Sequence, residues 1–283
     1  CLIGLACGDY LGMPYEFMSS DRVGLYFQSH KLEPLKLNVF NNEVVGFYTD
    51  DTAMMICLAE SLIENGFDPK DQFSRYKKWF YEGYATPLGD KAYGIGQQTL
   101  RALMGKSVSV NDPKAGGNGA LMRCAPVGLR YYQDMDQLVK HSIQSAIVTH
   151  NNSIATWSCV VLNSFIAYAL KGFDKQDFCQ ILLSETSGIP EELQNLLETD
   201  FNKLKVNQIQ TSGYSLNTLT IALYAFFVTD TFEDCLTKAI IVGGDADTQG
   251  AVAGALAGTY YGYEKIPKLW RETLMRHEYI TVE

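Results

Sequence analysis

The sequence has no closely spaced cysteine pair, which excludes two common structural devices. Its seven cysteines are odd in number and widely scattered, and no Cys-x-x-Cys spacing occurs. Neither a disulfide framework nor a zinc site of the usual spacing is therefore indicated. We expect buried, reduced thiols in a cytoplasmic protein.

Positive charge is also scarce. The chain has 23 Lys and Arg against 32 Asp and Glu, a net charge of −9 at pH 7. This balance argues against a broad nucleic-acid interface, which needs a basic stripe. A phosphate-bearing ligand remains compatible, because backbone N–H groups can bind phosphate locally. The apolar opening is cut by Asp9 and is too short to span a membrane, so we expect no membrane partner.

Strand-type alternation is weak throughout, and only short pieces such as KLNVF at residues 36–40 suggest a strand. Helical periodicity dominates, with helices expected near 53–66, 72–84, 137–150, 154–170, 216–228 and 232–242. Residues 19–48 are the least regular stretch and are expected to form a long loop. No Pro/Gly/Ser-rich linker and no solenoid repeat divides the chain. Hydrophobic residues make up 47% of the sequence, so a sizeable core can be buried. We predict an all-α protein of ten or more helices in a single domain, residues 1–283.

Two acidic clusters precede helical runs. The first is Thr49-Asp50-Asp51-Thr52, and the second is the segment 243–248, GGDADT. Carboxylates and hydroxyls without His or Cys are the ligand set of a hard cation such as magnesium, manganese or calcium. The alternative is N-capping, since Asp and Thr are preferred at helix starts. The paired glycines of the second cluster favour a special role, because they suit backbone that bends sharply or approaches another group closely.

Other segments carry weaker indications. Gly116-Gly117-Asn118-Gly119 is a glycine-rich turn that can hold phosphate, although it has neither P-loop nor Rossmann spacing. Asp9 and Glu16 lie in GDYLGMPYE. We interpret Asp9 as a helix-end or core polar residue and Glu16 as a surface charge, with functional roles as the alternative. His150, in the sequence THNN, is interpreted as a helix-terminal cap or a donor to a ligand. A stripe of small residues at 251, 254, 255 and 258 is typical of close helix packing.

Taken together, six segments resemble the ADP-ribosylglycohydrolase family in sequence and in order. They are GLACGDYLGMPYE, YTDDT, GNGALMR, a Thr-His pair, GYSLNTLTIALYAF and GGDADTQGAVAGALAG, and they run from residue 2 to about residue 262. That family includes the nitrogenase-reductase-activating hydrolase and the eukaryotic ADP-ribosylarginine and ADP-ribosylserine hydrolases. The resemblance implies an orthogonal helical bundle around a binuclear Mg²⁺ or Mn²⁺ centre. It further implies a hydrolase that removes ADP-ribose from a modified protein side chain or related acceptor.

The resemblance also implies roles for individual residues. The metal ligands would be Thr49, Asp50 and Asp51 on one side and Asp245, Asp247 and Thr248 on the other, with Asp247 as a bridge. Glu16 matches the family's mobile glutamate, and Glu16 or Asp51 would act as the general base. The substrate-binding positions would be Gly116, Gly117, Asn118 and Gly119 for the diphosphate and distal ribose, together with His150, Tyr93, Gly94 and Gly96.

One departure bears on the substrate. Nitrogenase-type and arginine-directed members resemble each other in having an acidic residue in a turn that here reads AYGIG, with Gly94 at the acidic position. This turn is more similar to the serine-directed branch, although Asp90 is a possible substitute for the missing acid. O-linked ADP-ribose is therefore slightly favoured over the arginine linkage. The alternatives are a non-catalytic ADP-ribose-binding relative and a two-metal phosphohydrolase acting on a nucleotide diphosphate. The oligomeric state is left open.

Overall fold

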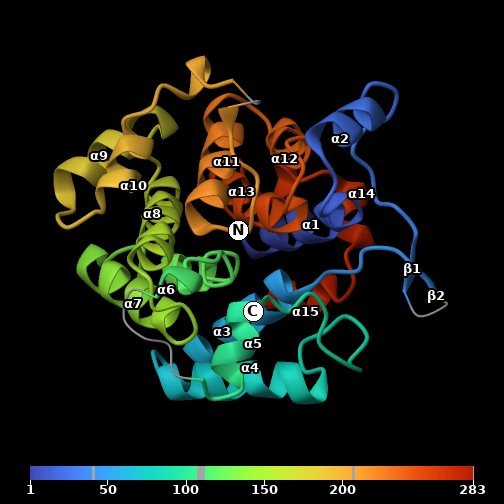
Figure 1. Cartoon of the computed structure of the whole chain (residues 1–283), viewed down its shortest axis with the longest axis horizontal. Coiled ribbons are helices and arrows are strands. Elements are labelled where there is room, and N and C mark those ends of the chain that lie inside the picture. The colour runs from blue at the N-terminus through green and yellow to red at the C-terminus, as the bar shows by residue number, and fades with distance from the viewer. Residues whose placement is uncertain (40–41, 107–111, 206–207, 283) are drawn as a thin grey trace.

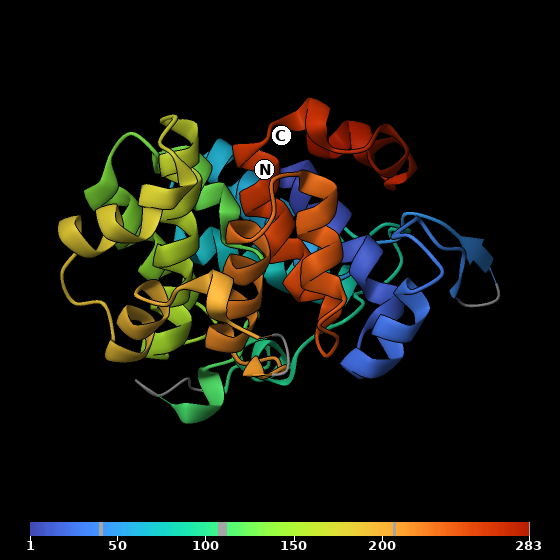
Figure 2. The ribbon, with the colours of Figure 1, turned by 90° about the horizontal axis from the view of Figure 1, so that it is seen from above.

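Helices form almost all of the regular structure. The computed structural model describes residues 1–39, 42–106, 112–205 and 208–282. Figures 1 and 2 show the helices packed around α1 and α13, with a small hairpin at the periphery. The elements are α1 (Leu2–Gly12), α2 (Ser20–Phe27), β1 (Leu37–Val39), β2 (Asn42–Val44), α3 (Asp50–Asn65), α4 (Pro69–Glu82), α5 (Gln97–Leu103), α6 (Ala125–Tyr131), α7 (Met135–Ile147), α8 (Ser153–Leu170), α9 (Phe178–Glu185), α10 (Glu191–Leu197), α11 (Ser215–Phe227), α12 (Phe232–Ile240), α13 (Ala246–Tyr260), α14 (Lys268–Thr273) and α15 (His277–Val282). The predicted all-α class is confirmed.

Helix α13 is the centre of the bundle. It contacts α1, α3, α8, α11 and α12, and its residues from Ala246 to Gly258 are buried. A helix that is apolar around its whole circumference must be covered on every side. The alanines and glycines of α13 leave room for these neighbours to approach closely.

Helices α1 and α13 pack antiparallel, backbone against backbone. Gly4 lies against Gly254, and Gly8 lies against Gly250. A methyl group added at Gly8 would overlap the Gly250 carbonyl and lie 2.7 Å from the Ala251 nitrogen. This contact confirms that the small-residue stripe serves helix packing. Because the helices run in opposite directions, the end of α1 lies beside the start of α13.

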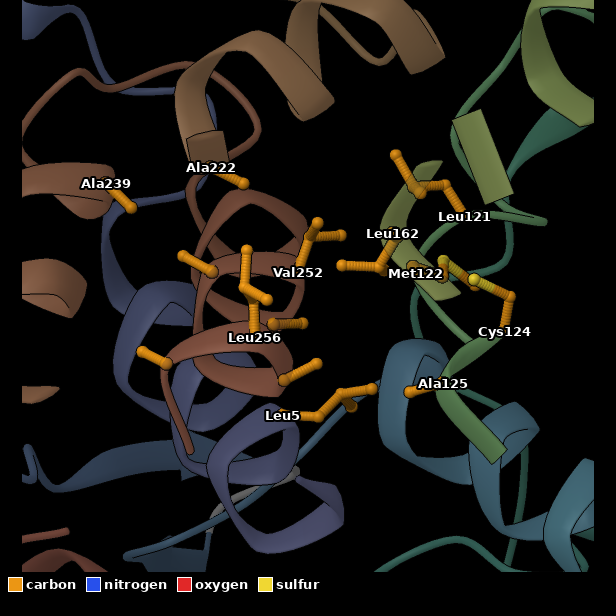
Figure 3. Close-up of a cluster of buried hydrophobic side chains, with 14 of the residues drawn as sticks. Leu5, Leu121, Met122, Cys124, Ala125, Leu162, Ala222, Ala239, Val252 and Leu256 are labelled. Atoms are coloured by element: carbon orange, nitrogen blue, oxygen red, sulfur yellow. The ribbon is translucent and has the colours of Figure 1, made fainter. Parts of the chain in front are cut away.

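The core connects these helices to the other half of the bundle. Figure 3 shows Leu5, Val252 and Leu256 on one side of a buried cluster and Leu162 and Met122 on the other. One large cluster of buried residues extends from α1 to α15. The single domain over residues 1–283 stays a prediction. Within the described residues, α8 alone is long and apolar enough to cross a membrane, and 78% of it is buried inside the fold. Such burial is that of a core helix.

The expected helices appear as α3, α4, α7, α8, α11 and α12, with ends shifted by a few residues. The long loop expected over 19–48 is partly wrong, because this segment contains α2 and the hairpin of β1 and β2. Helix α2 begins with a cap, where the Arg22 backbone N–H donates to Ser19 Oγ at 3.4 Å. Its aromatic residues Tyr26 and Phe27 pack on Tyr15, with ring centroids 5.6 and 5.2 Å away.

Candidate metal centre and ligand cleft

A carboxylate from α1 organises the first acidic cluster. Asp9 is fully buried and accepts hydrogen bonds from the backbone N–H groups of Thr49 at 3.1 Å and Thr52 at 3.0 Å. The Thr49 and Thr52 hydroxyls also donate to it, at 2.9 and 2.6 Å. The Thr49 side chain makes no capping hydrogen bond of its own. Asp9 therefore takes over the capping of α3, and the side chains of Asp50 and Asp51 are not needed for it.

Two glycines shape the second cluster. Gly243 and Gly244 have φ values of 74° and 79°, a backbone region in which residues with a side chain are strained. The Phe17 N–H donates to the Gly244 carbonyl at 2.7 Å, and the Gly244 N–H donates to the Met18 carbonyl at 2.8 Å. These bonds join the loop that carries Glu16 to the start of α13. The expected sharp bend and close backbone approach are both present.

The side chains of the second cluster face inward. Asp245 Oδ2 accepts from the Asn118 amide at 2.7 Å, and Asp247 Oδ1 accepts from the Thr248 N–H at 2.8 Å. Asp245 is the N-cap residue of α13, but its side chain makes no capping hydrogen bond. Helix capping therefore explains neither cluster fully.

Carboxylates from α1, from the loop that follows it, from α3 and from the start of α13 meet in two groups. Oxygens of Asp9, Asp51 and Asp247 lie within 4.8 Å of one another, as do oxygens of Glu16, Asp245 and Asp247. Asp247 belongs to both groups. Asp51 Oδ1 is buried without a hydrogen-bond partner. Hard oxygen donors, a shared carboxylate and an unsatisfied oxygen fit two divalent cations such as Mg²⁺ or Mn²⁺.

Mutual repulsion makes this cluster costly without a cation. Burial and neighbouring carboxylates raise the pKa values of Asp50, Asp51 and Asp247 well above their usual range. Burial, and next the charges of Asp245 and Asp9, raise the pKa of Glu16 to about 7. Such convergence of carboxylates is typical of a functional site.

Four of the acidic residues, Glu16, Asp50, Asp245 and Asp247, line a cleft of about 430 Å³. Eleven of the residues predicted as site residues line it, namely Glu16, Asp50, Gly94, Gly96, Gly117, Asn118, Gly119, His150, Asp245, Asp247 and Thr248. The structure therefore brings together residues from six separate segments of the sequence. The predicted site residues Thr49, Asp51, Tyr93 and Gly116 are not among the lining residues. Thr49 and Asp51 lie buried beside Asp9.

Sequence reasoning missed several lining residues. They are Phe17, Gln97, Gln98, Thr99, Lys114, Met122 and Gly213. Three of them directly follow Gly96, and Gly213 comes just before α11. Their nearness in sequence to the quoted motifs is the signal that could have identified them. The Gly213 carbonyl accepts from the Asn118 N–H at 2.9 Å, which joins the glycine-rich turn to α11.

The comparisons with known proteins agree with this geometry. A family model described as ADP-ribosylglycohydrolase matches residues 1–282. The chain belongs to the ADP-ribosylglycohydrolase family. It is 30% identical to the ADP-ribosylarginine hydrolase Tri1 of Serratia proteamaculans, over 99% of this chain and 75% of the relative. It is also 30% identical to the ADP-ribosyl-[dinitrogen reductase] glycohydrolase of Rhodospirillum rubrum, over 96% of this chain and 88% of the relative.

A solved structure named ADP-ribosylglycohydrolase-related protein complex has the same fold. It superposes with a TM-score of 0.82 and is 33% identical, covering 99% of this chain and 93% of that one. The predicted family is thus confirmed, and with it the interpretation as an ADP-ribosyl hydrolase at the level of the family. The roles assigned to single residues stay predictions.

The turn at Gly94 is the segment predicted to differ from the nitrogenase-type and arginine-directed members of the family. Gly94 has a φ of 79°, and a Cβ there would overlap Oδ1 of Asp50 and lie 3.2 Å from its Cγ. Tyr93 turns away toward Asp90, whose carboxylate accepts from the Tyr93 hydroxyl at 3.0 and 2.9 Å. Asp90 is exposed and does not line the cleft.

Proposed function

We propose that this chain uses two divalent ions, Mg²⁺ or Mn²⁺, to hydrolyse the bond between ADP-ribose and a protein side chain. The observation that carries the proposal is Asp247, a buried carboxylate that lines the cleft and is shared by two groups of acidic oxygens. Membership of the family supplies the substrate class. When bound, two such ions would orient the hydroxyls of the distal ribose and lower the pKa of a water near its anomeric carbon.

The protein's own groups divide the remaining work. Thr49, Asp50 and Asp51 are proposed to hold the ions from α3, and Asp245, Asp247 and Thr248 from α13. The glycine-rich turn presents backbone groups and Asn118 to the cleft, which suits a diphosphate and a ribose. His150 lies beside that turn, where a Cβ on Gly119 would be 2.9 Å from its Cε1.

Glu16 is the proposed general base. It lines the cleft, is only partly buried, and lies on a loop hydrogen-bonded to the start of α13. A carboxylate in this position takes a proton from water as the water attacks the anomeric carbon. The bond from that carbon to the acceptor then breaks, and the acceptor leaves with a proton.

We further propose that O-linked ADP-ribose is preferred over the arginine N-linked form. An arginine acceptor leaves as a guanidinium, a cation that a nearby acidic side chain stabilises. Gly94 supplies no such side chain, and Asp90 is engaged with Tyr93 outside the cleft. The preference rests on this turn alone. Overall identity does not favour it, because the ADP-ribosylarginine hydrolase Tri1 is 30% identical to the chain and the human ADP-ribosylhydrolase ARH3 is 26% identical.

The test compares peptides carrying a single ADP-ribose on serine and on arginine, with Mg²⁺, Mn²⁺ or EDTA. Chromatography with mass spectrometry identifies the product. We expect release of intact ADP-ribose that needs metal, is faster from serine, and is lost in Asp247→Asn. Asp136→Asn is the matched control, because Asp136 is exposed on α7.

Other products would support the rival functions. Release of AMP would overturn the proposal in favour of a phosphohydrolase. Binding of ADP-ribose without release from either peptide would favour the non-catalytic relative. Faster release from arginine would refute the linkage preference alone.

A further inference from the structure

Arg123 is a buried cation beside the cleft. Its residue is 1% exposed, and in the described part of the chain no carboxylate pairs with its guanidinium. It lies over the ring of Tyr76, 4.5 Å from the centroid. Its Nη1 donates to the Gly119 carbonyl, and its Nη2 donates to Thr149 Oγ1 at 2.7 Å. A buried arginine without a carboxylate is costly, and here the guanidinium is held by hydrogen bonds to Gly119 and Thr149 instead.

The Thr149 hydroxyl lies between Arg123 and His150. Thr149 Oγ1 is 2.7 Å from His150 Nδ1. A guanidinium can only donate, so the threonine oxygen accepts from Arg123. The hydroxyl has a single hydrogen, and among the described residues the acceptor in reach is His150 Nδ1. An Nδ1–H donating to the same oxygen would leave the buried hydroxyl hydrogen without an acceptor, which is costly. This favours Nδ1 as the acceptor, with the ring proton of neutral His150 on Nε2.

The Nε2 edge of His150 is turned toward the glycine-rich turn. A Cβ on Gly119 would lie 3.2 Å from Nε2, and one on Gly117 would lie 3.5 Å from it. His150, Gly117 and Gly119 all line the cleft. Burial, and next the charge of Arg123, lower the pKa of His150 to about 3, which keeps the ring neutral.

We propose that Arg123 and Thr149 are positioning residues that hold His150 as the Nε2–H tautomer, a fixed donor to an oxygen of the bound ADP-ribosyl group. The order of donation is Arg123 Nη2 to Thr149 Oγ1, then Thr149 Oγ1 to His150 Nδ1. The same guanidinium holds the Gly119 carbonyl, so one cation orients both the donor and the turn beside it. His150 consequently serves binding and does not act as an acid or base. The identity of the bound ligand as an ADP-ribosyl group rests on the proposed function, whereas the Nε2–H tautomer follows from the contacts of Thr149 and Arg123 alone.

The tautomer can be measured without substrate or metal. Two-bond ¹H–¹⁵N spectra of the full chain report which ring nitrogen carries the proton, and only four histidines contribute. The His150 signals are identified by their loss in His150→Gln. We expect the Nε2–H pattern from pH 6 to pH 8 in the wild type and in Thr149→Ser, which keeps the hydroxyl. Thr149→Val removes the hydroxyl at similar volume and should populate the Nδ1–H form.

Binding then tests what the tautomer is for. ADP-ribose binding by calorimetry should weaken about 3- to 10-fold in Thr149→Val, the effect of one hydrogen bond, and stay within about twofold in Thr149→Ser. A wild-type Nδ1–H ring, a ring that titrates near neutrality, or an unchanged tautomer in Thr149→Val would overturn the inference. So would an altered tautomer with unchanged affinity. If the wild type shows the Nε2–H ring but neither binds nor hydrolyses ADP-ribosyl compounds, the proposed function fails and the donor role fails with it, while the arrangement of the three side chains stands.

Discussion

The close contact between α1 and α13 makes Gly8→Ala a direct test of how the site is assembled. At Gly8 the added methyl group would overlap the backbone carbonyl of Gly250. Neither partner in this contact is a flexible side chain, so the two helices must move apart. Asp9 is the next residue along α1, and it holds the turn of Thr49 and Thr52 by hydrogen bonds. The substitution is therefore expected to disturb both the fold and the first acidic cluster.

The size of the effect follows from two opposing terms. Ordinary contact for such a methyl group begins at 3.4 Å, whereas the Ala251 nitrogen would be 2.7 Å away and the Gly250 carbonyl nearer still. Overpacking against rigid backbone costs about 3 kcal/mol, at the upper end of the usual range. The better helix propensity of alanine returns about 1 kcal/mol. The net loss of about 2 kcal/mol should lower Tm by about 4–8 °C.

Gly24→Ala is the matched control. Gly24 also lies within a helix, but nothing is within 4 Å of its added methyl group. Thermal unfolding should therefore show a Tm increase of about 2–4 °C for Gly24→Ala and a decrease for Gly8→Ala. The peptide assay at 20 °C should show slower ADP-ribose release in Gly8→Ala alone. A rise in Tm for both variants would refute the steric argument.

The remaining predictions concern the carboxylate cluster. The pKa of Glu16 is raised to about 7 in the folded, metal-free protein. Between about pH 4.5 and 7 the residue ionises in the unfolded chain but stays protonated in the folded one, so folding stability falls as pH rises through this range. In EDTA, Glu16→Gln should raise Tm by several degrees at pH 8 and change it little at pH 4. The gain at pH 8 corresponds to roughly 2 kcal/mol of folding free energy after solvent screening. An equal rise in Tm at both pH values would contradict this prediction. Mn²⁺ should raise the Tm of the wild type and leave that of Asp247→Asn unchanged, measured by scanning fluorimetry. Gly94→Ala should weaken the rise in Tm caused by Mn²⁺, because the added methyl group overlaps Asp50. Gly89→Ala is the control: Gly89 also has a positive φ, but nothing lies within 4 Å of the added methyl group, so the rise in Tm should be kept.

The helices were predictable where periodicity and end signals coincide. Helix α3 follows the TDDT cluster and ends before Gly66, as expected from the sequence. Helix α2 was missed because it spans only eight residues, and its apolar side is small. A short helix is stabilised mainly by the surface on which it packs, which for α2 includes Tyr15. The local sequence pattern of the helix does not reveal such a surface.

The candidate site was predictable in its residue types but not in its internal support. The chemistry of carboxylates and hydroxyls indicated a hard cation, and the family motifs indicated which residues to compare. Asp9 was read as a core polar residue or a functional one, and the structure shows how it supports the site: a buried acceptor for four groups of another helix. Such a role depends on a contact 40 residues away in sequence, which a single sequence does not reveal.

The balance of energies in the cluster decides between capping and function. A carboxylate that caps its own helix lowers the free energy of the fold, and nothing would then require several of them to converge. Here oxygens of Asp51 and Asp247 come within 4.8 Å of each other from two different helices, and Asp51 Oδ1 has no hydrogen-bond partner. Repulsion between buried like charges opposes folding. The close glycine contacts between α1 and α13 hold the helices together despite this cost, so the carboxylates stay near one another in an arrangement that a bound cation would stabilise.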